Sequence, residues 1–126
     1  MAVYRTTNGW IGHRILTTEA VLLTTRGRRS GSPRVTPLTA TLDGHRLVLV
    51  ASNGGAHKHP DWCLNLLDHP QVEVQRGSAK REMLARTADA DEREALWPRV
   101  VATYHGYEGY QRRTRREIPL VVCEPR

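Results

Sequence analysis

The chain has 126 residues, and we expect it to form a single domain over residues 1–126 with an irregular N-terminal segment over 1–18. Its formal net charge of +6 would suit nucleic acid, an anionic lipid surface or a polyanionic small molecule, and composition does not separate these three. No stretch has the length and apolarity of a signal peptide or a bilayer span. We therefore expect a cytoplasmic protein, with peripheral membrane contact as the less favoured alternative.

The predicted strands follow one another through turn signals and do not alternate with helices. Asp43-Gly44 is a two-residue hairpin signal. Pro37 indicates a bulge or a sheet-edge position, because proline cannot donate a hydrogen bond to a ladder. This series favours a closed antiparallel β-barrel of about six strands over a parallel α/β sheet. The strands are expected at residues 19–25, 34–42, 46–51, 71–76, 80–87 and 118–123.

Two helices are expected to accompany the barrel. A short helix near 60–68 begins at Pro60, which suits a first helical turn, and the next proline along the chain ends it. A longer helix near 89–112 begins at Asp89, because a glutamate three residues later is typical of a capping box. Pro98 lacks the backbone donor and clashes with the preceding turn, so we expect the longer helix to kink or restart there.

Cations crowd the turn after the first predicted strand. This turn reads R-G-R-R-S-G-S-P from Arg26 to Pro33, and Arg34 follows it. Guanidinium groups on a turn rich in glycine and serine can bind phosphate or carboxylate in bidentate fashion. A solvated basic loop is the alternative. We name Arg28, Arg29 and Arg34 as candidate ligands of an anionic group.

A glycine-bearing loop follows the third predicted strand. Ala51 ends that strand, and residues 52–55 (S-N-G-G) can take positive φ and let a ligand approach the backbone. If the first and third strands run in the same direction, the cationic turn and this loop lie at the same rim of the barrel and could meet one ligand. A plain strand-to-helix connection is the alternative.

Tyr104, Tyr107 and Tyr110 recur at steps of three residues. On a helix such a step turns by about 300°, so the rings would fan out over one broad face. They could cover a flat heterocycle, and a tyrosine hydroxyl can act as a general acid. Packing in the core or at an interface is the alternative.

The chain shows no arrangement typical of a metal centre or a hydrolase. Its six histidines form no ligand pattern with cysteines or acidic residues, so we expect no metal. No nucleophile motif occurs, which favours chemistry supplied by a bound cofactor. Cys63 and Cys123 form no C-x-x-C pair, and we expect buried thiols rather than a disulfide.

Four motifs follow one another in the order of a known family. They read L-L-T-T-R-G-R-R-S-G-x-x-R-x-x-P-L (Leu22–Leu38), V-A-S-x-G-G-x-x-K-x-P-x-W-x-x-N-L (Val50–Leu66), Y-x-x-Y-x-x-Y (Tyr104–Tyr110) and I-P-x-V-V (Ile118–Val122). Together they resemble the deazaflavin-dependent nitroreductase family, the F420-dependent reductases of mycobacteria and related actinobacteria. The likeness extends from about Val21 to the C-terminus, and the motifs are specific only as a set.

The resemblance implies a split β-barrel with coenzyme F420 bound across one end. The three arginines of the cationic turn would hold the phosphate and the anionic oligoglutamate tail, and the helix tryptophan would pack beside the cofactor. The cofactor-binding residues implied are Arg28, Arg29, Arg34, Pro37, Ala51, Ser52, Asn53, Gly54, Gly55, Trp62 and Tyr107. The substrate-lining residues implied are Thr39, Tyr104 and Tyr110, and the catalytic ones are Tyr107 and Tyr104.

Three positions depart from the family pattern. Asn53 stands where lysine is frequent, which removes one anion-binding charge. Cys63 stands where tyrosine is usual, and Thr39 replaces a larger, often aromatic residue near the substrate pocket. Substrate preference is therefore expected to differ from that of the best-known members.

We predict an F420-dependent oxidoreductase that transfers a hydride to an electron-poor acceptor such as an enone, a quinone or a nitroaromatic compound. A tyrosine or water would supply the proton. One alternative is a split-barrel protein that binds FMN or haem, and another is a basic barrel that binds nucleic acid without catalysis. We expect a small-molecule substrate, no nucleic-acid partner, and a monomer or homodimer.

Overall fold

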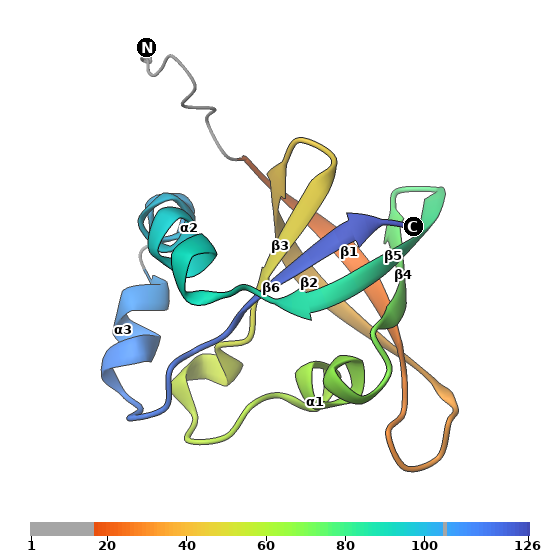
Figure 1. Cartoon of the computed structure of the whole chain (residues 1–126), viewed down its shortest axis with the longest axis horizontal. Helices are drawn as coiled ribbons and strands as arrows, with labels where there is room; N and C mark the ends of the chain where they lie inside the picture. The colour runs from red at the N-terminus through yellow and green to blue at the C-terminus, as the bar shows by residue number, and fades with distance from the viewer. Residues whose placement is uncertain (1–16, 105) are drawn as a thin grey trace.

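Six antiparallel strands close into a barrel in the order β1-β2-β3-β6-β5-β4 (Figure 1). The computed structural model describes residues 17–104 and 106–126. Its strands are β1 (Thr17–Arg26), β2 (Pro33–Asp43), β3 (Arg46–Val50), β4 (Gln71–Arg76), β5 (Ala79–Thr87) and β6 (Leu120–Pro125). Its helices are η1 (Asn53–Gly55), α1 (Asp61–Asp68), α2 (Ala90–Thr103) and α3 (Gly106–Arg112).

The predicted six-stranded antiparallel barrel is confirmed, and each predicted strand is found within a few residues of its expected bounds. The irregular segment expected over 1–18 lies outside the described residues, except that Thr17 and Thr18 already belong to β1. No helix of the described part of the chain is long and apolar enough to cross a bilayer.

The barrel is split along one side of β2. This strand pairs with β1 from Thr17↔Leu42 to Arg26↔Pro33, whereas β3 reaches only its last residues, 41–43. Pro37 lies in the stretch without a second neighbouring strand and pairs with Leu22 in an uninterrupted register. It therefore occupies a sheet edge, one of the two predicted positions, and forms no bulge. An edge suits proline because no neighbouring strand needs its missing N–H.

Two apolar clusters hold the fold together. The larger one fills the barrel, where side chains of all six strands meet Trp62, Cys63 and Leu66 of α1. Helix α1 thus closes one end of the barrel, below the strands in Figure 1. The smaller cluster packs Leu96 and Val100 of α2 against β3 and β6. Burial of these side chains is the main favourable term of folding.

The long helical region differs from its prediction. Helix α2 continues through Pro98 and ends at Thr103, and a separate helix, α3, begins at Gly106. The interruption lies at Tyr104, whose φ of −158° is extended. Pro98 is tolerated because Glu94, the residue whose carbonyl loses its donor, is exposed, so water can satisfy that carbonyl.

The predicted capping box at the start of α2 is confirmed. Glu92 N–H donates to Asp89 Oδ1 over 2.8 Å, and Asp89 N–H donates to Glu92 Oε1 over 3.1 Å. We expect Asp89→Ala to lower the free energy of unfolding by about 1 kcal/mol, because an unpaired amide results. Asp91→Ala, in the same turn without a capping bond, should cost no more than about 0.5 kcal/mol. Urea unfolding measures both, and equal losses would contradict the capping assignment.

Candidate functional site

The cationic turn between β1 and β2 is a closed loop at the α1 end of the barrel. Gly27 N–H donates to Ser32 O and Gly31 N–H donates to Gly27 O, both over 2.8 Å. Gly27 is buried, and a Cβ at this position would come within 2.8 Å of Ser30 Oγ. The loop therefore has a defined shape, and its arginine side chains project from a fixed base.

Arg28 is turned back onto α1. Its backbone N–H and its Nη1 both donate to Asn65 Oδ1, over 3.1 and 2.9 Å, and its Nη2 lies 3.4 Å from Asp61 Oδ1. Asn65 is only 5% exposed, and its Nδ2 donates to Thr25 Oγ1 over 3.3 Å. A buried amide is costly to leave unpaired, so this network fixes the turn against α1.

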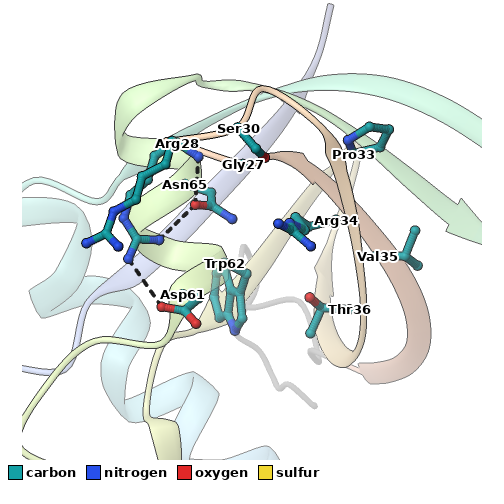
Figure 2. A pocket seen from close by; sticks show the side chains of 11 residues that line it. Gly27, Arg28, Ser30, Pro33, Arg34, Val35, Thr36, Asp61, Trp62 and Asn65 are labelled. Carbon is teal, nitrogen blue, oxygen red and sulfur yellow. Dashed lines mark hydrogen bonds and ion pairs between the residues drawn. The ribbon is translucent and has the colours of Figure 1, made fainter.

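A pocket of about 570 Å³ lies between this turn and α1 (Figure 2). Arg29 and Arg34 are exposed on its wall, and within the described chain no carboxylate lies at ion-pair distance from either. Trp62 contributes its ring, and Figure 2 shows Arg34 between this ring and the turn. The lining residues are Gly27, Arg28, Arg29, Ser30, Pro33, Arg34, Val35, Thr36, Asp61, Trp62 and Asn65.

The glycine loop lies at the same end of the barrel, as predicted from strand direction. β1 and β3 are each antiparallel to β2 and therefore run the same way. Figure 1 shows η1, α1 and the β1–β2 turn together below the strands. The loop itself does not line the cationic pocket, where α1 supplies the wall facing the turn. The prediction that both segments lie at the same rim is confirmed, and the prediction that they contact one ligand stays a prediction.

Three consecutive residues of the loop have positive φ: Asn53 at 48°, Gly54 at 64° and Gly55 at 82°. Asn53 tolerates this conformation better than most residues do, and its Nδ2 donates to Lys58 O over 3.1 Å. A Cβ on Gly54 would meet nothing within 4 Å, which leaves the backbone open to a ligand. Gly55 instead is buried, and a Cβ there would lie 2.9 Å from Tyr110 O of α3.

The three tyrosines form a cluster rather than a fan. Their ring centroids are 4.8 Å (Tyr104–Tyr107), 6.1 Å (Tyr104–Tyr110) and 6.4 Å (Tyr107–Tyr110) apart. The hydroxyls of Tyr104 and Tyr110 are 3.0 Å apart. The fan prediction was wrong because Tyr104 lies before α3, at the break between the two helices, so its ring is free to turn toward the other two.

Tyr107 is half-buried beside the smaller apolar cluster. Its side chain packs partly against the cluster of β3, β6 and α2. Burial raises the pKa of Tyr107, and the neighbouring Tyr104 and Tyr110 raise it further. The hydrogen bond with Tyr110 likewise raises the pKa of the Tyr104 hydroxyl. Both phenols are therefore protonated at neutral pH.

Pro37 and Thr39 are exposed on the unpaired edge of β2, whose residues 33–36 line the cationic pocket. Cys63 and Cys123 are buried free thiols, as predicted, and burial raises the pKa of Cys63 to about 11. Within residues 17–104 and 106–126, no three His, Cys, Asp or Glu side chains are grouped for a metal ion.

Two residues of the site were not named from the sequence. Asn65 carried a signal, because it is a polar residue on the same helical face as Trp62 and Leu66 and lies within the second motif. Arg116 carried none, because it is one of four arginines in a polar stretch, Arg112, Arg113, Arg115 and Arg116. Its side chain donates to the glycine loop.

Comparison with known proteins decides the family. The family model described as F420H(2)-dependent quinone reductase matches residues 1–125. The chain belongs to this family. F420H(2)-dependent quinone reductase Rv1261c of Mycobacterium tuberculosis is 39% identical over 129 aligned positions, which cover 99% of this chain and 87% of the relative.

Two solved structures agree with this F420H(2)-dependent quinone reductase assignment. An F420-H2 dependent reductase, FDR-A, is 38% identical, with a TM-score of 0.77 over 90% of this chain and all 100% of its own. A relative described as a domain-swapped dimer is also 38% identical, with a TM-score of 0.76 over 88% of this chain and 81% of its own.

The family confirms the predicted F420-dependent oxidoreductase, its split barrel and F420 as its coenzyme. The alternatives of an FMN or haem protein and of a nucleic-acid-binding barrel are set aside. The roles of individual residues and the choice between monomer and homodimer stay predictions.

The two glycines of the loop provide a matched test of its geometry. Gly54→Ala should lower the free energy of unfolding by about 1–2 kcal/mol, the conformational cost of left-handed backbone for a residue with a Cβ. Gly55→Ala should cost about 2–4 kcal/mol, because the same strain is joined by a clash with the backbone of Tyr110. Thermal unfolding measures both. Equal losses would show that Gly55 does not pack closely against α3.

Proposed function

We propose that this protein binds F420 along the rim formed by the cationic turn, α1 and the glycine loop, and reduces a quinone beside the tyrosine cluster. The main observation in support of this proposal is that the guanidinium groups of Arg29 and Arg34 are exposed in one pocket. Among the described residues, three arginines and a single carboxylate, that of Asp61, line this pocket. A pocket with this excess of positive charge favours an anionic ligand.

The pocket suits the phosphate and the oligoglutamate tail of the coenzyme. Its volume of about 570 Å³ is within the usual range for small-molecule sites. Arg29 and Arg34 can each form paired hydrogen bonds to phosphate or carboxylate oxygens, and guanidinium is the side-chain group best matched to that geometry.

We assign Arg28 a different role from the direct ligand contact expected from the sequence. Its donors bind Asn65 and Asp61, so in this conformation they hold the turn against α1. Its charge adds positive potential to the pocket, and its ion pair with Asp61 offsets the negative charge of that carboxylate. We assign Arg28 to positioning, and Arg29 and Arg34 to direct contact with the tail.

The glycine loop and the tyrosines suit the other end of the coenzyme and its substrate. Bound F420H2 supplies a hydride, and reduction of a quinone to a hydroquinone then requires one further proton. Gly54 leaves room for a flat ring to approach the backbone, and α3 is in contact with the same loop. Tyr107 is protonated at neutral pH and half-buried, so its hydroxyl can supply that proton. Thr39 and Pro37 lie on the open edge of β2 beside the pocket, and we assign Thr39 to the substrate and Pro37 to the coenzyme.

The proposal is tested first by titrating the purified protein with F420 and, separately, with FMN, following fluorescence. We expect F420 to bind in the micromolar range or tighter and FMN to bind at least tenfold more weakly. Reduction of a soluble quinone by F420H2 is then followed by absorbance. Preference for FMN, or F420 binding without quinone reduction, would contradict the proposal.

Arg29→Ala and Arg34→Ala should each weaken F420 binding by about 1–3 kcal/mol, the range for hydrogen bonds to charged groups. Wild-type affinity should fall as salt is raised, and less steeply in the variants, because each lacks one screened charge. Arg81→Ala, an exposed arginine of β5 outside this pocket, is the matched control and should leave the affinity unchanged. Unchanged affinity in both pocket variants would show that the oligoglutamate tail of F420 does not bind in this pocket.

Tyr107→Phe should lower kcat for quinone reduction by about 100-fold, the lower end for a lost general acid, while the Kd for F420 changes less than about threefold. Tyr104→Phe breaks the contact with Tyr110 and leaves Tyr107 in place, so its effect on kcat should be smaller. Stopped-flow kinetics measures both variants. Full activity of both would show that neither Tyr107 nor Tyr104 supplies the proton.

A further inference from the structure

The side chain of Arg116 reaches from the segment between α3 and β6 into the glycine loop. Its Nη2 donates to Ser52 O over 2.7 Å and to Ala51 O over 3.2 Å, and its Nε donates to Ala56 O over 2.9 Å. Its Nη1 lies 2.8 Å from His59 Nδ1. One half-buried guanidinium thus holds four acceptors that are 57 to 65 residues away in the sequence.

His59 completes this arrangement as an acceptor. Burial lowers the pKa of His59, and the charge of Arg116 lowers it further, so the ring is neutral at neutral pH. A neutral imidazole offers a lone pair on one nitrogen, which here faces the Arg116 donor. The loop is therefore fixed at its beginning, at Ala51 and Ser52, and again at its end, at Ala56 and His59.

Arg116 is itself held by its neighbours. Thr114 Oγ1 accepts from Arg116 N–H over 3.3 Å, and Gln111 Nε2 donates to Arg116 O over 2.7 Å. Gln111 Oε1 in turn accepts from Ile118 N–H over 2.8 Å. The segment that carries Arg116 is thus anchored to α3 and to the residues that lead into β6. A guanidinium on such a base can impose a geometry on a loop, because its own position is fixed.

The backbone polar groups of the loop fall into two sets, those that are hydrogen-bonded within the protein and those that are not. The carbonyls of Ala51, Ser52 and Ala56 are taken by Arg116, and Gly55 N–H and Ala56 N–H are used inside the turn, on Ser52 O and Asn53 O. Among the residues the structure describes, Asn53 N–H and Gly54 N–H have no acceptor. These two donors belong to the residues whose left-handed backbone is open to a ligand.

We propose that Arg116 is the positioning residue of the coenzyme loop: by holding its carbonyls and His59, it fixes residues 51–59 in the conformation that offers the Asn53 and Gly54 amides to the coenzyme. This rests on the proposed function, since it takes that loop as the F420 site. Arg116 acts through the loop, because each of its three guanidinium nitrogens already contacts an acceptor of residues 51–59.

The fork geometry of arginine is required for this role. Separate nitrogens of the guanidinium contact separate acceptors: Nε contacts Ala56 O, Nη1 contacts His59 Nδ1 and Nη2 contacts Ser52 O. The single ammonium of lysine cannot reach all of them. Arg116→Lys therefore keeps the charge and most of the stem but loses the simultaneous contacts. This variant separates the geometric role from a purely electrostatic one.

The experiment compares Arg116→Lys and Arg116→Met with Arg115→Met, an exposed neighbouring arginine that serves as the control. The first readout is amide hydrogen exchange in the protein without coenzyme, at Gly55 and Ala56 of the loop. Ala85, whose N–H donates to Pro70 O, reports on the barrel. The second readout is the Kd for F420 by fluorescence titration.

Both Arg116 variants should speed exchange at Gly55 and Ala56 at least tenfold, leave Ala85 unchanged and weaken F420 binding at least tenfold, with Arg115→Met like the wild type. Unchanged exchange at the loop would overturn the proposal, as would equal loss of protection at Ala85, or full coenzyme affinity in Arg116→Lys. Failure of the proposed function itself would appear separately, as absence of F420 binding by the wild-type protein.

Discussion

Antiparallel closure of the barrel is the constraint on which the site depends. Because β2 is antiparallel to both β1 and β3, the segments that leave β1 and β3 emerge at one rim. Helix α1 fills that end of the barrel with Trp62, Cys63 and Leu66, so tightly packed side chains lie directly beneath the rim. Both the cationic turn and the glycine loop are built onto it. A ligand at this rim would contact the two loops, which the strands and α1 hold in place.

Two polar residues hold the loops against the rest of the barrel through hydrogen bonds. Asn65 joins the cationic turn and β1 to α1, and Arg116 joins the glycine loop to the segment before β6. Each is a side chain whose hydrogen bonds go to groups far away in the sequence. Buried or half-buried groups of this kind are costly to leave unpaired, so they favour one loop conformation over others. Arg29, Arg34 and Gly54 stay exposed beside these fixed groups, which is the arrangement that the proposed coenzyme site requires.

Much of the fold followed from local pattern. The strands and the capping box at Asp89 are dictated by residues within a few positions of one another, and the structure contains them. Pro37 indicated a bulge or an edge, and strand pairing decided for the edge. The break between α2 and α3 did not follow, because Pro98 is the strongest local helix breaker and yet the chain continues through it. Tyr104, where the helix does end, has no such signature, and the tyrosine cluster depends on that break.

The sequence by itself determined the fold class, the family and the residue types of the site, because periodicity, turn residues and ordered motifs are properties of the chain. Tertiary structure decided which groups are free to bind. Arg28, Arg29 and Arg34 are alike in sequence, yet only Arg28 faces Asn65 and Asp61. Arg116 is indistinguishable from its arginine neighbours until the fold brings it to Ala51 and Ser52. Hydrogen-bond partners separated by 33 to 65 residues are set by packing, so the sequence around either partner does not predict them.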